Sequence, residues 1–277
     1  MKNRALTLLK VVVSLGLIAY LFMRMDLSQL GETLSRANYV YLLPAGVLYV
    51  AAMTNAGFKW YVLLCAQGIR VPFRAILGYT YIGFFFNNFL PANVGGDVMR
   101  GYGLARYTER TAEAAISVIV DRIVGLVAFM VSAVGSAAVA ILVLQRSELE
   151  GVETAAVVSL IVVAGGFGLI LSRRVRVLLA RAFQWRPLRP LSPLYGRVSE
   201  AIGAYRHRYG ALAAAFGLSL LTLVLTNFTD YLLAQSLGGG MPLIYIFVFN
   251  PIIAFVLLVP ISIGGLGITQ AIYPFFY

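Results

Sequence analysis

Long runs of apolar residues, separated by short polar segments, dominate the chain. A helix needs about 20 such residues to cross the hydrocarbon core of a bilayer. The pattern predicts spans at residues 5–23, 39–58, 114–144, 154–171 and 211–237. Run 114–144 would measure about 46 Å as a helix, which exceeds a core of about 30 Å. Residues 123–144 suffice to cross, so we expect the preceding part to emerge into the interface.

Two shorter apolar runs end in the same pattern, a proline followed by paired glycines. Run 76–90 leads into Pro91-Ala92-Asn93-Val94-Gly95-Gly96, and run 243–259 leads into Pro260-Ile261-Ser262-Ile263-Gly264-Gly265. Repeated broken helices of this kind form sites near the bilayer midplane in many transporters. Such clusters also interrupt membrane helices without any repeat, which is the alternative interpretation.

The composition supports a multi-pass membrane protein. Sixty per cent of the 277 residues are hydrophobic and 12% are charged, more apolar surface than a soluble domain of this size can bury. One cysteine and one histidine exclude an internal disulfide and leave no zinc or haem constellation, so we expect no cofactor. Charged residues flank the apolar runs and form no separate basic domain, which argues against nucleic-acid binding.

The distribution of arginine predicts the topology. Residues 172–209 hold nine arginines against one acid, Glu200, and are therefore expected in the cytoplasm. The basic residues before run 5–23 favour an uncleaved first helix with a cytoplasmic N-terminus. Counting spans from these points, run 76–90 begins and ends on the cytoplasmic side, and run 243–259 enters from outside. One re-entrant hairpin from each face constitutes an inverted repeat.

The predicted fold is therefore an all-α, multi-pass integral membrane protein with about five to seven transmembrane helices. Two re-entrant hairpins in an inverted repeat complete it. We expect one membrane domain over 1–277, divided into a first helix and outer loop (1–38), a first repeat (39–144), a connecting span (145–171), an arginine-rich cytoplasmic loop (172–209) and a second repeat (210–277). The second repeat lacks the helix that follows the first hairpin and looks truncated.

The densest polar segment at membrane depth is residues 86–100. Asn87, Asn88 and Asn93 offer neutral donors and acceptors. Backbone amides at Gly95 and Gly96, with a helix expected to begin at Val98, suit an anion. Asp97 occupies an N-cap position one turn before Arg100, so capping is the alternative to a substrate or coupling role.

Three further groups carry polar or aromatic side chains. Asp121-Arg122 precedes an uncharged stretch, either as an interfacial anchor with a local ion pair or with Arg122 directed at a lipid phosphate and Asp121 holding it. Ser219, Thr222, Thr226 and Asp230 share one helix face; the hydroxyls suit helix packing, whereas an intramembrane carboxylate is a functional candidate. Trp60 is expected as an interface anchor.

Three motifs in order resemble one family. They are Asn88-x-x-Pro91-x-x-x-Gly95-Gly96-Asp97-x-x-Arg100, then Asp121-Arg122-x-x-Gly125, then Pro260-x-Ser262-x-Gly264-Gly265-x-Gly267. The pattern is similar to the lysylphosphatidylglycerol synthase transmembrane-region family of flippase-like, UPF0104-type proteins. The resemblance implies a bacterial or archaeal cytoplasmic membrane protein that handles anionic or polyprenyl-linked lipids. It adds Ser262, Gly264 and Gly265 to the substrate-binding candidates.

The chain departs from that family pattern at two points. Gln270 stands where an acid is expected, and the helices that usually close the second half are absent. A partner subunit or a second copy is therefore expected to complete that half.

The expected function is a lipid flippase that moves an anionic phospholipid or a polyprenyl-linked lipid. Its partners are membrane lipids with anionic or phosphate head-groups, met by Arg100 and Arg122. The alternative is a non-transporting scaffold that recruits a lipid- or glycan-modifying enzyme through residues 172–209. No catalytic motif is present, so we expect no enzyme activity.

Overall fold

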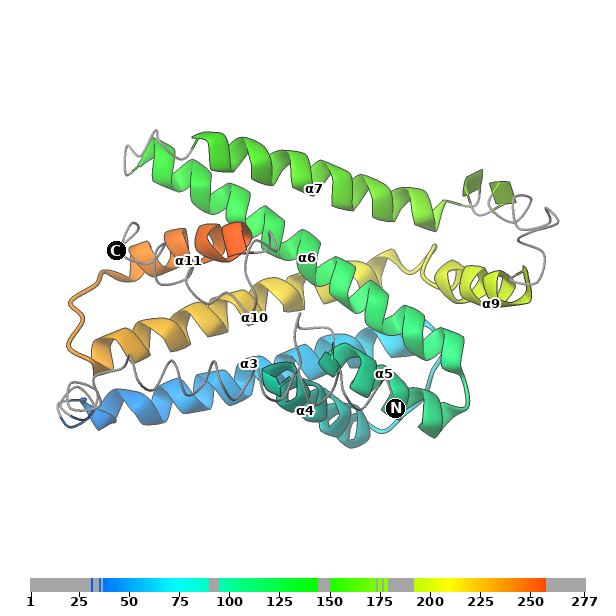
Figure 1. The fold of residues 1–277 in the computed structure, drawn as a ribbon, viewed down its shortest axis with the longest axis horizontal. Helices are drawn as coiled ribbons and strands as arrows, with labels where there is room; N and C mark the ends of the chain where they lie inside the picture. Colours follow the sequence, from blue (N-terminus) through cyan, green and yellow to red (C-terminus); the bar gives the residue numbers. More distant parts are fainter. Residues whose placement is uncertain are drawn as a thin grey trace, which may run out of the picture.

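A computed structural model describes residues 37–89, 95–143, 150–172 and 192–257, together with residues 31, 35, 174, 175, 177 and 178. Over these ranges all regular secondary structure is helical (Figure 1). The helices are α3 (Tyr39–Ala66), α4 (Phe73–Phe89), α5 (Gly95–Thr108), α6 (Thr111–Leu142), α7 (Glu150–Leu171), α9 (Ser192–Gly203), α10 (Tyr209–Ser236) and α11 (Leu243–Leu257).

Three described helices, α3, α6 and α10, are long and apolar enough to cross a membrane. They contain most of the predicted spans 39–58, 114–144 and 211–237. Helix α6 continues without a break from Thr111 to Leu142, so the residues before the uncharged stretch belong to the same helix. The predicted span 154–171 lies within α7, and 5–23 lies outside the described residues.

Helices α3 and α10 pack against each other as an antiparallel pair. The backbone N–H of Asn38, just before α3, donates to the carbonyl of Ser236 at the end of α10, over 2.7 Å. Further along the pair, Asn55 Nδ2 donates to the Leu218 carbonyl at 2.7 Å and to Thr222 Oγ1 at 2.8 Å. The polar face of α10 is thus satisfied by an asparagine of α3, as expected for polar groups facing a bundle interior.

The units α3–α4 and α10–α11 have closely similar local structure. Helices α3 and α10 each contain 28 residues. Each is followed by a glycine with positive φ, +81° at Gly68 and +78° at Gly238, a conformation that ends helices and that glycine adopts without strain. A proline then precedes each short helix, Pro72 before α4 and Pro242 before α11. Because α3 and α10 are antiparallel, α4 and α11 follow opposite ends of that helix pair (Figure 1).

Helices α4 and α5 form an antiparallel pair with close contacts at their glycines. A Cβ at Gly83 would lie 3.1 Å from the Gly96 carbonyl oxygen, and one at Gly103 would lie 2.7 Å from the Tyr79 ring. Helix α5 begins at Gly95, three residues before the predicted start at Val98. Neither helix spans a core of about 30 Å, because 17 and 14 residues give about 25 and 21 Å.

Helix α11 contains Pro251, which lacks the N–H that would bond the Phe247 carbonyl. Ser136 Oγ of α6 donates to that carbonyl at 3.1 Å. Ile252 and Ile253 pack with Ala137 and Ala140 of α6 in one buried cluster. The second Pro-Gly-Gly segment, residues 260–265, lies outside the described residues. The hairpin predicted there therefore stays a prediction.

Candidate functional site

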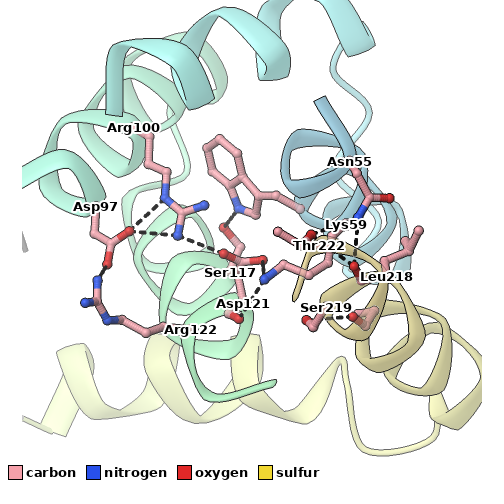
Figure 2. Close-up of polar contacts among 12 residues, drawn as sticks. Asn55, Lys59, Asp97, Arg100, Ser117, Asp121, Arg122, Leu218, Ser219 and Thr222 are labelled. Carbon is pink, nitrogen blue, oxygen red and sulfur yellow. Dashed lines mark hydrogen bonds and ion pairs between the residues drawn. The ribbon is translucent and has the colours of Figure 1, made fainter. Parts of the chain in front are cut away.

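Five charged side chains from three helices meet where α3, α5 and α6 pack together (Figure 2). We call them the basic cluster: Lys59, Asp97, Arg100, Asp121 and Arg122. Lys59 lies seven residues before the end of α3, about 10 Å along the axis. A 28-residue helix centred on the hydrocarbon core would extend about 6 Å beyond it at each end, so Lys59 would lie a few Å inside the boundary with the head-groups.

Asp121 is the buried centre of the basic cluster. Its Oδ1 lies 3.0 Å from Lys59 Nζ and its Oδ2 lies 2.8 Å from Arg100 Nη2. The side chains of Asp121, Lys59 and Arg100 are 7%, 11% and 11% exposed. Breaking such a buried pair leaves an uncompensated charge, so each member depends on the others.

Asp97 links two arginines at the more open side of the basic cluster. Its Oδ1 contacts Arg100 Nη2 at 2.8 Å and accepts from Arg100 Nε at 3.0 Å. Its Oδ2 pairs with Arg122 Nη1. The Arg122 side chain is 42% exposed, so Asp97 joins a buried guanidinium to one in contact with the surroundings.

Two predictions about these residues are wrong. Asp97 is not the N-cap of α5, because the helix already begins at Gly95 and Asp97 is its third residue. Its carboxylate binds Arg100 and Arg122 instead. Asp121 does not hold Arg122: it pairs with Lys59 and Arg100, whereas Arg122 pairs with Asp97. Consecutive helical residues point about 100° apart and so reach different neighbours.

Trp60 is fully buried, which overturns its prediction as an interface anchor. Its ring lies 4.9 Å from Arg100 Cζ, and its Nε1 donates to Ser117 Oγ at 3.1 Å. The ring supports the guanidinium by a cation–π contact, and the hydrogen bond fixes the ring against α6. Trp60 therefore positions Arg100.

Asn87 and the first glycines of α5 adjoin the basic cluster. Asn87 Oδ1 accepts from the Gly96 backbone N–H at 2.8 Å, which satisfies one of the free amides at the start of the helix. A Cβ at Gly96 would overlap the Gly83 carbonyl and lie 2.6 Å from Asn87 Oδ1. Gly95 begins the same helix. The Asn88 side chain, Asn93, Ser262, Gly264 and Gly265 lie outside the described residues.

Asp230 lies apart from the basic cluster. Asn250 Nδ2 of α11 donates to Asp230 Oδ2 at 2.8 Å and to Asn227 Oδ1 at 3.3 Å; these three residues are the Asp230 cluster. Asn55 is one turn from Lys59 on α3 and bonds Thr222, which is two turns from Asp230 on α10. The two clusters are therefore separated by about 18 Å along the helices.

Comparison with known proteins identifies the family. Residues 7–277 match the family described as "Lysylphosphatidylglycerol synthase TM region". The chain belongs to this family. It is also 28% identical over 114 residues to a UPF0104 membrane protein of Methanothermobacter thermautotrophicus. That match spans 40% of this chain and 34% of the relative, so the chain covers about a third of the relative's length. No solved structure matches the chain.

Membership of the lysylphosphatidylglycerol synthase TM region family confirms the resemblance drawn from the three motifs. It indicates a membrane protein with a lipid-related role, in agreement with the apolar helices. Two of the motifs meet in the structure, since Asp97 and Arg100 of the first contact Arg122 and Asp121 of the second. Gly125 of the second motif faces Lys59, whose Nζ would lie 3.4 Å from a Cβ there.

Sequence reasoning missed Lys59 and Ser117 in this family member. Lys59 is the only charged residue of α3, and an isolated charge in an apolar helix marks a functional candidate. That signal was available. Ser117 had no comparable signal, because its role depends on the packing of Trp60 against α6.

A separate polar cavity of about 550 Å³ lies beside the C-terminal end of α9. Gln67, Glu109, Arg110, Glu113 and Glu200 line it. Nearby, the buried Tyr205 hydroxyl donates to Gln67 Oε1 at 3.2 Å. Burial, and to a lesser extent the charge of Asp121, raise the pKa of Tyr205, so that this hydroxyl remains a neutral donor.

Proposed function

We propose that this protein is a lipid transporter that moves an anionic phospholipid or a polyprenyl-linked lipid across the cytoplasmic membrane. The basic cluster is the observation that carries the proposal. It contains three cations and two carboxylates and so has a formal charge of +1. A centred α3 would place it close to the boundary between the core and the head-groups, where a lipid phosphate would supply the missing negative charge.

The pair formed by Asp97 and Arg122 suggests how a lipid phosphate would bind. A guanidinium offers a planar fork that matches phosphate oxygens. In the described conformation Asp97 occupies Arg122 Nη1. An arriving phosphate would take over this contact, while Asp97 keeps its two contacts with Arg100. Arg122 therefore binds the head-group, and Asp97 holds that arginine in place when no head-group is bound.

An inverted repeat is part of the proposal. It is supported by the equal lengths of α3 and α10, their antiparallel packing and the matching positive-φ glycines. Helix α4 with α5 forms one re-entrant hairpin, and α11 begins the other from the opposite face. Alternating exposure of a site between such halves is the usual mechanism of repeat transporters.

The proposed orientation places the basic cluster near the cytoplasmic face. Arg100, Arg106 and Arg110, with the arginine-rich segment 172–209, follow or flank the helix ends that surround it. The N-terminus is proposed to be cytoplasmic as well, following the bias of basic residues to that side.

Reconstitution tests the proposal directly. Purified protein in liposomes is supplied with head-group-labelled phosphatidylglycerol, lysyl-phosphatidylglycerol or a polyprenyl phosphate, and movement between leaflets is measured. Arg122→Ala is expected to abolish movement. Arg70→Ala is the matched control, because Arg70 is an exposed arginine outside the basic cluster.

Equal rates for the wild type and Arg122→Ala contradict the assigned site. Absence of movement for all three lipids, from protein shown to be folded, contradicts transport itself. That result favours a scaffold that recruits a modifying enzyme through residues 172–209. Neutralising arginines in that segment then reduces recruitment, whereas Arg122→Ala leaves it unchanged.

A further inference from the structure

Asp230 is a carboxylate in an apolar helix, six residues before the end of α10, and no described cation forms an ion pair with it. It is the only charged residue in α10, and α11 has none. Lys59, the one charged residue of α3, is engaged with Asp121. Among the described residues no lysine, arginine or histidine forms an ion pair with Asp230, whereas each carboxylate of the basic cluster has two such partners.

The titratable groups on the surrounding helices do not supply positive charge. Apart from Lys59 and Asp230 itself, the titratable residues of α3, α10 and α11 are tyrosines (Tyr39, Tyr41, Tyr49, Tyr61, Tyr209, Tyr231 and Tyr245) and Cys65. Residues 123–142 of α6 contain no titratable side chain, and α7 contributes only the acids Glu150 and Glu153 at its start. Within the described residues the protein therefore supplies no counter-charge to Asp230, and a cation from solution would provide one.

The neighbours of Asp230 suit a small monovalent cation. Asn250 holds the Asp230 carboxylate and the Asn227 carbonyl oxygen with the same amide nitrogen. An amide carries both a donor and an acceptor, so half a turn of the Asn250 side chain would present a third oxygen to the same space. In the described part of the chain no group of three acidic, histidine or cysteine residues could hold a metal ion, which disfavours a multivalent one.

The backbone next to Asn250 is also interrupted. Pro251 leaves the Phe247 carbonyl without its helical donor, and Ser136 of α6 supplies the replacement. Irregular helices in transporters commonly form their sites for Na⁺ or H⁺. The Asn250 amide that contacts Asp230 therefore lies close to the hydrogen bond by which Ser136 joins α6 to α11.

We propose that Asp230, Asn227 and Asn250 form the binding site of a coupling cation, either H⁺ or Na⁺. The coupling role rests on the proposed transport function, but binding of the cation does not. The formal charges complement each other, +1 at the basic cluster and −1 at Asp230. An anionic head-group at the first and a cation at the second neutralise both.

Thermal unfolding in detergent tests binding without reference to transport. The Tm of the wild type is measured in NaCl and in choline chloride at equal ionic strength, each from pH 5 to pH 8. A cation at ten times its Kd raises the Tm by roughly 3 °C. Asp230→Asn removes this rise, and Glu153→Gln, an acid on α7, retains it.

The two cations give different results. A Tm higher in NaCl than in choline, lost in Asp230→Asn, supports a sodium site. A Tm that falls as the pH rises in both salts, with the fall lost in Asp230→Asn, supports a proton site. Identical salt and pH profiles for the wild type and Asp230→Asn overturn the proposed site.

Lipid movement under imposed Na⁺ or pH gradients then tests coupling. Movement that responds to one gradient in the wild type and not in Asp230→Asn supports it. Lipid movement that is equal with and without both gradients overturns coupling. If the wild type moves no lipid, the transport function fails, and the cation site is still decided by the Tm profiles.

Discussion

The basic cluster includes a residue of α3 and the Asp230 cluster includes residues of α10, two helices of equal length. The carboxylates in the two clusters have opposite surroundings. In the first, Asp121 is 7% exposed and lies between Lys59 and Arg100. In the second, Asp230 is exposed and its described side-chain contact is the neutral amide of Asn250. The protein compensates one acid internally with an excess of positive charge and leaves the other to its surroundings.

This difference separates a structural charge from a responsive one. A buried acid with two cations stays ionised and ties three helices together, so its loss affects folding. An acid held only by amides can change its state with little effect on the fold. The comparison predicts that mutations in the two clusters affect different measurements.

The largest effect is expected for Asp121→Asn. It leaves the Lys59 ammonium buried without its main partner and should cost about 3–5 kcal/mol of stability. The free energy of unfolding in detergent measures the loss. Asp230→Asn in choline buffer should change stability by less than about 1 kcal/mol.

A second change sharpens this prediction. Lys59→Met removes the orphaned ammonium, so Lys59→Met/Asp121→Asn should recover at least half of the lost stability. If the double variant is no more stable than Asp121→Asn, the Lys59 contact is not the reason for the loss.

Gly96→Ala is expected to have the next largest effect. The methyl group would overlap the Gly83 carbonyl and push apart the helix pair that carries Asp97 and Arg100, at a cost of about 1–3 kcal/mol. Thermal unfolding measures it. Gly135→Ala in α6 is the matched control, because its Cβ meets nothing within 4 Å, and it should be neutral or stabilising. Similar destabilisation of both variants would contradict the close helix contact.

Asn250→Lys would make the Asp230 cluster resemble the basic cluster. Asn250 Nδ2 lies 2.8 Å from the carboxylate, so an ammonium there gives Asp230 a permanent partner. The cation-dependent rise in Tm, roughly 3 °C, should disappear. Asn250→Gln retains a neutral amide and should keep most of that rise; a rise of equal size in Asn250→Lys would show that the cation binds elsewhere.

The smallest effect is expected for Trp60→Phe. It keeps an aromatic ring beneath Arg100 but removes the hydrogen bond to Ser117, which is worth about 1 kcal/mol. Denaturant unfolding of the purified protein measures it. Ser117→Ala removes the same bond from the other side, so the double variant should lose little more than either single one. Additive losses would contradict a shared contact.

Periodicity and length were enough to locate α3, α6, α7 and α10, because a membrane demands long apolar helices. The same reasoning selected Asp97, Arg100, Asp121 and Arg122 as candidates, and it placed Arg100 one turn after Asp97, a pair that the structure contains. It also paired Asp121 with Arg122, which the structure does not do. The partners that it missed are 62 positions apart for Lys59–Asp121 and 25 for Asp97–Arg122. Such pairs depend on how helices pack, and a single sequence does not specify this.

The separation of the two clusters gives the protein a permanent electric dipole. One excess positive charge and one excess negative charge are about 18 Å apart along the helix axes. In the proposed orientation the positive pole faces the cytoplasm. The membrane voltage, negative inside, then acts on both poles in the same sense, at about 2.3 kcal/mol per charge for each 100 mV crossed. The resting potential would favour this orientation of the protein, and binding at either pole would change its sensitivity to voltage.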